Sequence, residues 1–262
     1  MKQDILSHLP GDFPWQVQYF DLLPSTNTYL KELAAKGAPH GLCVIAESQS
    51  AGRGRMGRSF LSPANRGLYL SVLLRPNCKA EELMHLTCAV GLAVCDAIKD
   101  VTGYQAGIKW INDLVAGNKK LGGILTELSV DPATANVDYA VVGIGINLSG
   151  LTFPPELENI ATSLEAVTGN VPQRGMLIAK LLIHLEQMSR ELLQEKAAIM
   201  TRYRSLCITL GKEITLVRSD ACRQGTALDI TEDGSLLVKF SDGSIQAVNS
   251  GEVSVRGLYG YL

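Results

Sequence analysis

Apolar and polar positions along the chain follow two different spacings, which predict helices in some segments and strands in others. Residues 25–37 have apolar side chains at helical spacing, open on a serine or threonine that can cap a helix, and close at Gly37. Residues 81–99 and 176–207 carry longer stripes of the same spacing. These three segments are predicted to be helices.

Four apolar runs between these segments are predicted to be strands: residues 41–47, 67–76, 120–128 and 139–148. The first is short and nearly continuously apolar, as in a buried strand, and the second is bounded by glycine and proline. The pair Gly117-Asn118 marks a turn before the third. Helices and strands are therefore mixed in the manner of an α+β fold.

Beyond Gly211 the hydrophobic period becomes 2. Short alternating segments are separated by Ser219-Asp220, Asp233-Gly234 and Asp242-Gly243, which are residue pairs typical of hairpin turns or close to them. We place a boundary near residues 206–212 and predict two domains, a large one at 1–207 and a small β-barrel at 208–262.

Composition limits the kinds of partner. The chain has 262 residues, 46% of them hydrophobic, and a formal net charge of −2, which argues against a polyanion as its main partner. Six cysteines form no C-x-x-C pair and mostly lie in apolar runs, as expected of reduced thiols in a cytoplasmic protein. No signal peptide or membrane span is predicted, because no window approaches ~18 uninterrupted apolar residues.

The stretch ESQSAGRGRMGRSF, residues 47–60, concentrates glycine and arginine. Its glycines formally match the dinucleotide-binding fingerprint G-x-G-x-x-G. That fingerprint requires a helix to begin at the last glycine and an acidic residue about 20 positions later. Pro63 and Gly67 would break such a helix, and no acidic residue lies between Gly57 and Glu81. A solvated surface loop is the simpler interpretation when the stretch is taken alone.

A second polar segment changes this interpretation. KWINDL, residues 109–114, brings Lys109, Asn112 and Asp113 together, and Lys119-Lys120 follows. Adjacent Asn and Asp can coordinate hydrated Mg²⁺ or fix a ribose, and lysine can bind a phosphate or carboxylate. Either segment could be an ordinary turn or hairpin tip, but together they indicate a site for an anionic, phosphate-bearing substrate.

Five motifs occur in the order seen in biotin protein ligases, and the chain resembles that family along nearly its whole length. They are STN at 25–27, Q-x-AGRGRMGR at 49–58, KWINDL at 109–114, KKLGGIL at 119–125 and GIGIN at 143–147. SGEVSVR, residues 250–256, resembles the end of the family's small C-terminal domain. One departure is Ile111, where the family usually has proline. The resemblance implies a class II synthetase-like mixed-sheet catalytic domain with flanking helices, followed by an SH3-like β-barrel.

The activity that the resemblance implies is an ATP-dependent ligation. Biotin would be activated as biotinyl-5'-AMP with ATP and Mg²⁺, then transferred to a lysine of a biotin carboxyl carrier protein of a biotin-dependent carboxylase. A cytoplasmic monomer or homodimer is expected. Only about 20 residues precede STN, too few for the DNA-binding domain of some members, so we expect a ligase without repressor function. A lipoate or octanoate ligase and a nucleic-acid-binding module are the alternatives.

The resemblance also implies roles for individual residues. Lys120, Arg55 and Arg53 would be catalytic. Biotin would be bound by Ser25, Thr26, Asn27, Gln49, Arg53, Gly54, Arg55 and Lys120. The nucleotide would be bound by Arg55, Arg58, Phe60, Lys109, Asn112, Asp113, Lys120 and Asn147, with Asn112 and Asp113 serving Mg²⁺. The glycines of residues 52–57 are expected to give that loop little structure of its own, so that it can order around the ligand.

Overall fold

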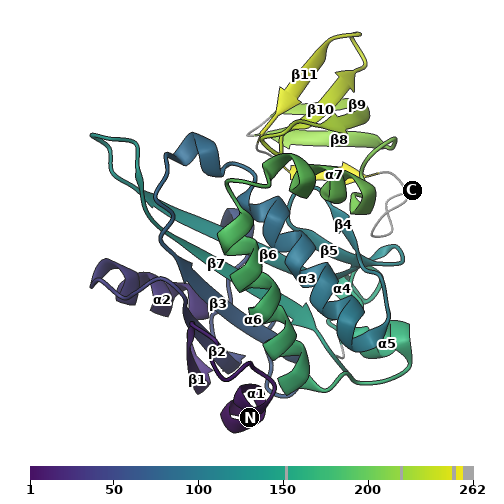
Figure 1. The fold of residues 1–262 in the computed structure, drawn as a ribbon. Coiled ribbons are helices and arrows are strands. Elements are labelled where there is room, and N and C mark those ends of the chain that lie inside the picture. The colour runs from purple at the N-terminus through teal and green to yellow at the C-terminus, as the bar shows by residue number, and fades with distance from the viewer. Residues whose placement is uncertain (151–152, 219–220, 250–251, 256–262) are drawn as a thin grey trace.

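A seven-stranded mixed sheet organises the larger part of the chain (Figure 1), in a computed structural model that describes residues 1–150, 153–218, 221–249 and 252–255. The strand order is β1-β2-β3-β7-β6-β5-β4, with β1 parallel to β2 and the other neighbours antiparallel. The strands are β1 (Gln16–Leu23), β2 (Leu42–Gln49), β3 (Gly67–Leu74), β4 (Gly107–Lys109), β5 (Asp113–Ala116), β6 (Lys119–Val130) and β7 (Val137–Asn147).

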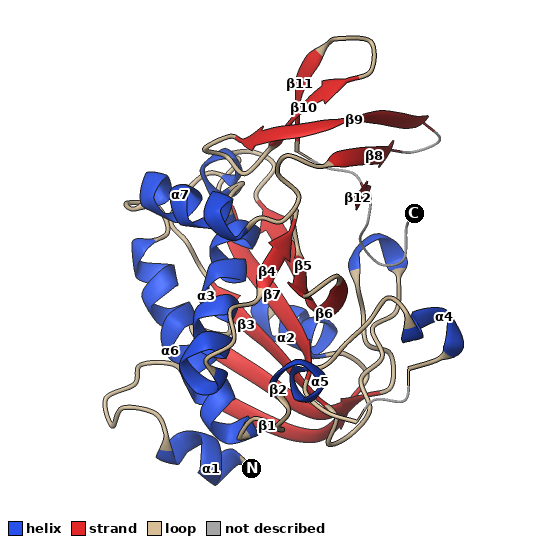
Figure 2. Ribbon diagram, turned by 90° about the vertical axis from the view of Figure 1, so that its right-hand side faces the viewer, coloured by secondary structure: helices blue, strands red, loops and turns tan. Residues whose placement is uncertain are grey.

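Helices cover the two faces of this sheet unequally. Helices α3 (Leu86–Thr102) and α6 (Arg174–Glu191) lie side by side along one face (Figures 1 and 2), where their apolar stripes and the strands form the main core. Helix α2 (Thr26–Ala35) lies on the other face over a smaller cluster that includes Leu73 and Val141. Only the first turn of α2 reaches the glycine-containing part of β7, where Asn27 lies against Gly143.

The remaining helical segments are short, apart from the helix that leads to the C-terminal strands. They are α1 (Lys2–Ser7), the 3-10 turns η1 (Arg55–Gly57) and η2 (Ala80–Leu83), α4 (Pro155–Glu158), α5 (Leu164–Thr168) and α7 (Lys196–Leu206).

The C-terminal part is a second, antiparallel sheet of five described strands in the order β11-β10-β9-β8-β12, consistent with the expected SH3-like domain. They are β8 (Glu213–Arg218), β9 (Ala221–Ile230), β10 (Leu236–Phe240), β11 (Ile245–Val248) and β12 (Glu252–Val255). Asp233-Gly234 and Asp242-Gly243 lie between consecutive strands, as predicted. Ser219-Asp220 and the ends of the SGEVSVR motif, Ser250, Gly251 and Arg256, lie outside the described residues.

Hydrogen bonds cross the predicted boundary near residues 206–212. The Ile208 N–H donates to the Ile108 carbonyl at 2.9 Å. The Trp110 indole Nε1 donates to the Gly234 carbonyl at 2.8 Å, and the Trp110 backbone N–H donates to Thr209 Oγ1 at 2.9 Å. The C-terminal sheet is thereby tied to the segment that precedes Asn112, and the boundary itself stays a prediction.

Two predicted helices differ from the observed ones. The expected helix at 176–207 is broken into α6 and α7, and the buried His85 imidazole contacts the Leu192 carbonyl at 2.8 Å where α6 ends. The helix expected at 81–99 begins at Leu86, after the 3-10 turn η2. Both differences involve tertiary contacts or local turns that the apolar stripe alone does not reveal.

Candidate active site

Glycines form the floor of a pocket on the face of the sheet that α3 and α6 leave uncovered. In the register of the sheet, Gly143 pairs with Ser71 of β3 and with Leu125 of β6. A Cβ added at Gly143 would lie 2.1 Å from Asn27 Oδ1, and one added at Gly145 would lie 2.5 Å from the Phe60 ring. Side chains from other elements therefore occupy the space that these two glycines provide.

The pocket above this floor has a volume of about 60 Å³. It brings together ten of the fourteen predicted site residues: Ser25, Thr26, Asn27, Gln49, Arg53, Gly54, Arg55, Phe60, Asn112 and Lys120. The other lining residues are Gly123, Ile124, Leu125, Gly143, Ile144 and Gly145. Residues from the start of α2, the end of β2, the glycine-arginine loop and the strands β6 and β7 thus meet in one place.

One end of the pocket is a network of uncharged polar groups. Ser25 caps α2 and accepts a hydrogen bond from the Thr28 N–H at 3.4 Å, which puts Thr26 and Asn27 in the first turn. The Thr26 N–H donates to Gln49 Oε1 at 2.9 Å. The Ser71 hydroxyl lies 2.7 Å from Thr26 Oγ1 and 2.6 Å from Asn27 Oδ1. These groups are buried but hydrogen-bonded, so the network is satisfied and can hold its geometry.

The other end of the pocket is basic, and each cation has an acidic or amide partner. Lys120 Nζ donates to Asp113 Oδ1 at 2.6 Å, and Arg55 Nη1 donates to Asn112 Oδ1 at 2.7 Å. Such charge-assisted bonds are short and directional. Lys120 Nζ lies 3.7 Å from where a Cβ on Gly123 would be, and Asn27 of the polar network binds the carbonyl of Leu125, two residues farther along β6. The basic groups and the polar network therefore lie at different positions along β6.

The glycine-arginine loop has more structure of its own than its glycines predict. The Gly54 N–H donates to the Arg58 carbonyl at 2.7 Å, and the Phe60 N–H donates to the Gly52 carbonyl at 2.8 Å. Arg53 and Ser59 form an antiparallel bridge between the two arms. Arg53 and Arg55 project from this small hairpin to opposite partners, since Arg53 Nη1 donates to Glu127 Oε2 at 3.2 Å.

Four predicted site residues do not line the pocket. Asp113 accepts the hydrogen bond from Lys120, and Arg58 is exposed on the loop. Lys109 is buried at the end of β4. Asn147 is also buried, and its Nδ2 donates to the Thr162 carbonyl at 2.9 Å.

Two polar residues that contact the site were not predicted, although each is distinctive in the sequence of its strand. Ser71 is the one polar side chain in the strand GLYLSVLL, and Glu127 is the one acidic residue of β6. Ser71 joins the polar network, and Glu127 binds Arg53 and Asn27. A polar residue in an otherwise apolar strand is the signal that could have identified Ser71, and the single acidic residue of β6 is the signal for Glu127.

The oxygens of Asn112 and Asp113 do not fit a resident magnesium ion as they stand. Each already accepts a hydrogen bond from a cation, Arg55 or Lys120, and these positive charges oppose a divalent metal nearby. Among the described residues, no group of three or more His, Cys, Asp and Glu side chains could hold a metal. Mg²⁺ usually binds through one or two carboxylates together with substrate phosphates. The donor set here suits an ion that arrives with the nucleotide.

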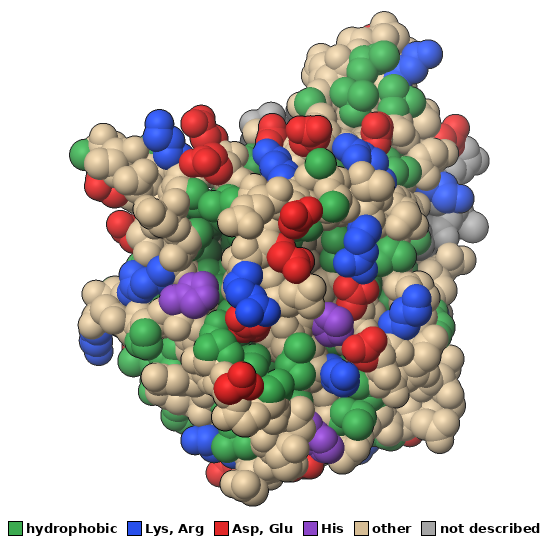
Figure 3. Space-filling model, in the orientation of Figure 1, with side chains coloured by type: hydrophobic (Ala, Val, Ile, Leu, Met, Phe, Trp, Pro, Cys, Tyr) green, Lys and Arg blue, Asp and Glu red, His purple; other side chains and the backbone are tan. Residues whose placement is uncertain are grey.

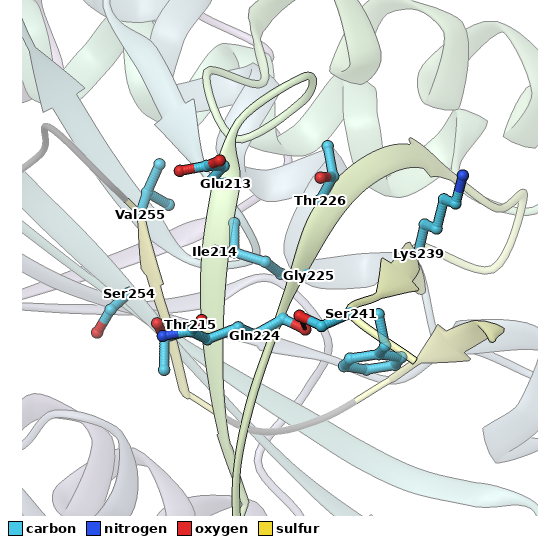
Figure 4. Close-up of a pocket in the computed structure, with 11 residues that line it drawn as sticks. Glu213, Ile214, Thr215, Gln224, Gly225, Thr226, Lys239, Ser241, Ser254 and Val255 are labelled. Carbon is cyan, nitrogen blue, oxygen red and sulfur yellow. Dashed lines mark hydrogen bonds between the residues drawn. The ribbon is translucent and has the colours of Figure 1, made fainter. Parts of the chain in front are cut away.

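A larger hollow of about 680 Å³ lies on the C-terminal sheet (Figure 4) and contains none of the predicted site residues. Thr215 and Gln224 face each other across β8 and β9, and the Ser241 hydroxyl donates to the Gln224 carbonyl at 3.1 Å. Glu213 and Lys239 lie toward opposite sides of the view. This hollow lacks the paired cations and the polar network. We therefore place the chemistry in the smaller pocket.

Comparisons with known proteins agree with this site. The sequence profile of the Biotin/lipoate A/B protein ligase family matches residues 19–147, and that of the Biotin protein ligase C terminal domain matches residues 209–256. The bifunctional ligase/repressor BirA of Bacillus subtilis is 33% identical over 240 residues, covering 90% of this chain and 73% of its own length. The biotin–[acetyl-CoA-carboxylase] ligase of Mycobacterium tuberculosis is 32% identical over 235 residues, covering 87% of this chain and 85% of its own length.

A solved structure with the same fold also carries relevant ligands. The biotin protein ligase from Aquifex aeolicus in complex with biotin and ATP superposes with a TM-score of 0.78 at 30% identity, covering 92% of this chain and 98% of that one. Fold, motifs and both profile matches agree along most of the sequence. The chain belongs to the biotin/lipoate A/B protein ligase family, among the members that carry the biotin protein ligase C-terminal domain.

Proposed function

We propose that this protein is an ATP-dependent biotin protein ligase, which forms biotinyl-5'-AMP and transfers the biotinyl group to a lysine of a biotin carboxyl carrier protein. The observation that carries the proposal is one pocket with two unlike ends. Thr26, Asn27 and Gln49 supply neutral hydrogen-bonding groups at one end, and Lys120 and Arg55 supply positive charge at the other. Biotin has the matching polarity, a neutral ureido ring joined by an apolar chain to a carboxylate.

The substrate orientation follows from that polarity. The ureido group has two N–H donors and one carbonyl acceptor, which suit the hydroxyl and amide groups of Thr26, Asn27 and Gln49. Leu125, which pairs with Gly143 and so shares its face of the sheet, lines the pocket and would provide apolar contact for the aliphatic chain. The carboxylate would lie beside Lys120, within the reach of Arg53 and Arg55.

In the first half-reaction, a biotin carboxylate oxygen attacks the α-phosphorus of ATP. A new P–O bond to the carboxylate forms as the bond to pyrophosphate breaks, with both reactants negatively charged. Fixed positive groups reduce this repulsion and stabilise the additional charge of the transition state. Lys120 and Arg55 are our candidates, and Asn112 is the neighbouring group for the nucleotide. Mg²⁺, carried by the ATP phosphates, would neutralise part of their charge.

In the second half-reaction, the neutral amine of the acceptor lysine attacks the acyl carbon of the adenylate. The C–N bond forms, the bond to AMP breaks, and the amine loses a proton. Lys120 would stabilise the developing negative charge on the acyl and phosphate oxygens. Arg58, Lys109, Asp113 and Asn147 stay proposed members of the nucleotide side, beyond the residues that line the pocket.

Ligand binding requires the glycine-arginine loop to rearrange. A space of about 60 Å³ is smaller than the roughly 300–1,000 Å³ of a typical small-molecule pocket. Arg53 and Arg55 line this space, so we propose that they exchange Glu127 and Asn112 for ligand oxygens while the loop moves outward and closes again. A closed loop would protect the adenylate from hydrolysis.

Lipoate ligation is the nearest alternative, since the family includes both activities. The apolar dithiolane ring of lipoate cannot satisfy the polar end formed by Thr26, Asn27 and Gln49. A site that hydrogen-bonds a substrate group discriminates against an analogue that lacks this group. The polar network is therefore the specific observation that favours biotin.

The partner and the compartment are part of the proposal. We propose a cytoplasmic enzyme, monomeric or homodimeric, that recognises a carrier protein rather than DNA. On the face shown in Figure 3, Lys and Arg side chains of described residues are interspersed with Asp and Glu. The net charge of −2 also provides little basis for a nucleic-acid partner. Among the described residues, no helix is both long and apolar enough to span a bilayer.

The test is a direct assay. The protein is incubated with biotin, ATP, Mg²⁺ and a purified biotin carboxyl carrier domain, and the mass of the carrier is measured. We expect a gain of one biotinyl group that requires ATP and the acceptor lysine, and little modification with lipoate in place of biotin. Transfer of lipoate in preference to biotin would reject the proposal, as would an unmodified carrier.

A further inference from the structure

Glu127 is an acidic residue that holds groups from two other elements beside the pocket without lining the pocket itself. Its Oε1 accepts from Lys31 Nζ of α2 at 2.8 Å. Its Oε2 accepts from Asn27 Nδ2 at 3.0 Å and from Arg53 Nη1 at 3.2 Å. The Glu127 side chain is 18% exposed. One carboxylate on β6 thus connects the first turn of α2 with the glycine-arginine loop.

The bond to Asn27 fixes the orientation of its amide group. Asn27 Nδ2 has two partners, Glu127 and the Leu125 carbonyl at 3.2 Å, and both can only accept when Glu127 is ionised. The Asn27 oxygen must then face Ser71 and lie over Gly143, where a Cβ would be 2.1 Å from it. The reverse amide orientation would place an oxygen against two acceptors. Glu127 therefore determines which atom Asn27 presents to its neighbours.

The bond to Arg53 holds one side of the loop. The Arg53 side chain is 45% exposed, and the ion pair with Glu127 directs it back toward the pocket. Arg55, two residues later, is bound to Asn112 on the opposite side. The two arginines thus attach the hairpin to two separate parts of the sheet region, and Glu127 provides the attachment nearer the polar end.

Glu127 is ionised in this environment at neutral pH. Burial raises the pKa of the Glu127 carboxyl, but the hydrogen bonds from Lys31 and Asn27 and the charges of Lys31 and Arg53 outweigh it and leave that pKa below its usual value. Lys31 would remain as a partner when Arg53 turns to a ligand carboxylate. The Glu127 carboxylate then keeps a positive partner, which reduces its repulsion of the ligand carboxylate.

We infer that Glu127 is a positioning residue for biotin, which orients the Asn27 amide and returns Arg53 to the pocket mouth. This inference rests on the proposed function. It assigns Glu127 no contact with the substrate, since Glu127 acts through Asn27 and Arg53. Its effect is therefore confined to the biotin side of the reaction and does not extend to the nucleotide side, where Arg55, Asn112 and Lys120 lie.

The test compares Glu127→Ala and Glu127→Gln with wild type in steady-state biotinylation. The loss of hydrogen bonds to a charged group should raise the KM for biotin about tenfold in Glu127→Ala, with the KM for ATP and kcat changed by less than about threefold. Glu127→Gln keeps the shape and one accepting oxygen, so we expect an intermediate KM for biotin. Glu32→Gln removes the same charge from the exposed face of α2 and should leave every parameter at the wild-type value.

Two outcomes would overturn the inference. One is an unchanged KM for biotin in both Glu127 variants. The other is a parallel rise of the KM for biotin and the KM for ATP together with a lower Tm, which indicates general loss of structure. If Glu127→Ala does not fold, the isosteric Glu127→Gln decides the question. An inactive wild-type protein would instead reject the proposed ligase function, so the two failures are distinguishable.

A double-mutant cycle tests the route through Arg53. If Glu127 acts partly by positioning Arg53, the effects of Glu127→Ala and Arg53→Ala on the KM for biotin should be less than additive. Fully additive effects in a folded double variant would remove Arg53 from the inference and contradict it.

Discussion

Val142 and Ile144 of β7 belong to the core beneath α3 and α6, whereas Gly143 and Gly145, between and beside them, form the floor of the pocket on the opposite face. The same contrast holds on β3, where Leu70 belongs to the core and Ser71 belongs to the polar network. Because successive strand residues point to opposite faces, adjacent positions meet different requirements. Large apolar side chains on one face stabilise the fold. Glycines and a small polar side chain on the other face leave room for the pocket.

This comparison indicates that stability and substrate binding can be separated within a single strand. It also makes the register of the sheet critical, since a slip by one residue would put isoleucines into the pocket and glycines beneath the helices. Variants at adjacent positions should therefore differ in their effects: those on the helix-covered face should lower stability, and those on the pocket face should change biotin binding or catalysis.

The largest effect is expected for Leu70→Ala on the helix-covered face. Leu70 is fully buried, and Leu→Ala changes in cores cost about 2–5 kcal/mol of the free energy of unfolding. Denaturant unfolding measures this loss, and the KM for biotin of the folded fraction should stay at the wild-type value. A shifted KM with normal stability would contradict the separation of the two faces.

Lys120→Ala should have the next largest effect, on catalysis rather than stability. Removal of one preorganised charge from a transition state costs roughly 3 kcal/mol, or on the order of 100-fold in rate. Biotin-dependent pyrophosphate release measures adenylate formation. Lys119→Ala is the matched control, because Lys119 Nζ donates to the Glu158 carbonyl at 3.0 Å and does not line the pocket. Near wild-type release by Lys120→Ala would exclude its catalytic role.

Arg55→Gly should weaken retention of the adenylate. Loss of a charged hydrogen-bond donor is worth about 1.5–3 kcal/mol, so the intermediate should escape roughly tenfold faster or more. Biotinylation of lysines on an unrelated bystander protein measures the escape, with reactions lacking ATP as the control. Bystander labelling at the wild-type level would mean that Arg55 does not hold the intermediate.

The smallest effect is expected for Ser71→Ala, beside Leu70 but on the pocket face. The Ser71 hydroxyl supports Thr26 and Asn27 through neutral hydrogen bonds, which contribute about 0.5–1.5 kcal/mol each. The KM for biotin should rise several-fold, to a much smaller extent than Lys120→Ala lowers the rate. A normal KM for biotin would show that the network does not depend on this hydroxyl.

The strands and helices near the site could be predicted because their apolar patterns are long and bounded by clear end signals. Strands β2, β3, β6 and β7 and helix α2 lie where the sequence indicates them. Strand β1 was not predicted, because its positions are mostly partly exposed and do not alternate. The division between α6 and α7 was also missed, since it coincides with the His85 contact to Leu192, more than 100 residues away.

Site residues that belong to a sequence motif could be predicted. Residues whose role depends on contacts between distant segments could not. Ser71 and Glu127 acquire their roles from contacts with Asn27, which is 44 and 100 residues away in sequence. Hydrophobic periodicity does not reveal contacts between residues so far apart in the sequence. Lys109 and Asn147 show the reverse case, in which a motif residue is buried outside the pocket.

The central claim is that the glycine face binds biotin while the helix face stabilises the fold, and one paired titration tests it most directly. Biotin is titrated calorimetrically into Gly143→Ala and Val142→Ala, and the Tm of each variant is recorded. Gly143→Ala adds a methyl group where Asn27 Oδ1 lies 2.1 Å away, so we expect it to lose most biotin affinity. Val142→Ala should lower the Tm and leave the Kd for biotin unchanged. Equal biotin affinity in both variants, or weakened binding only in Val142→Ala, would contradict the account.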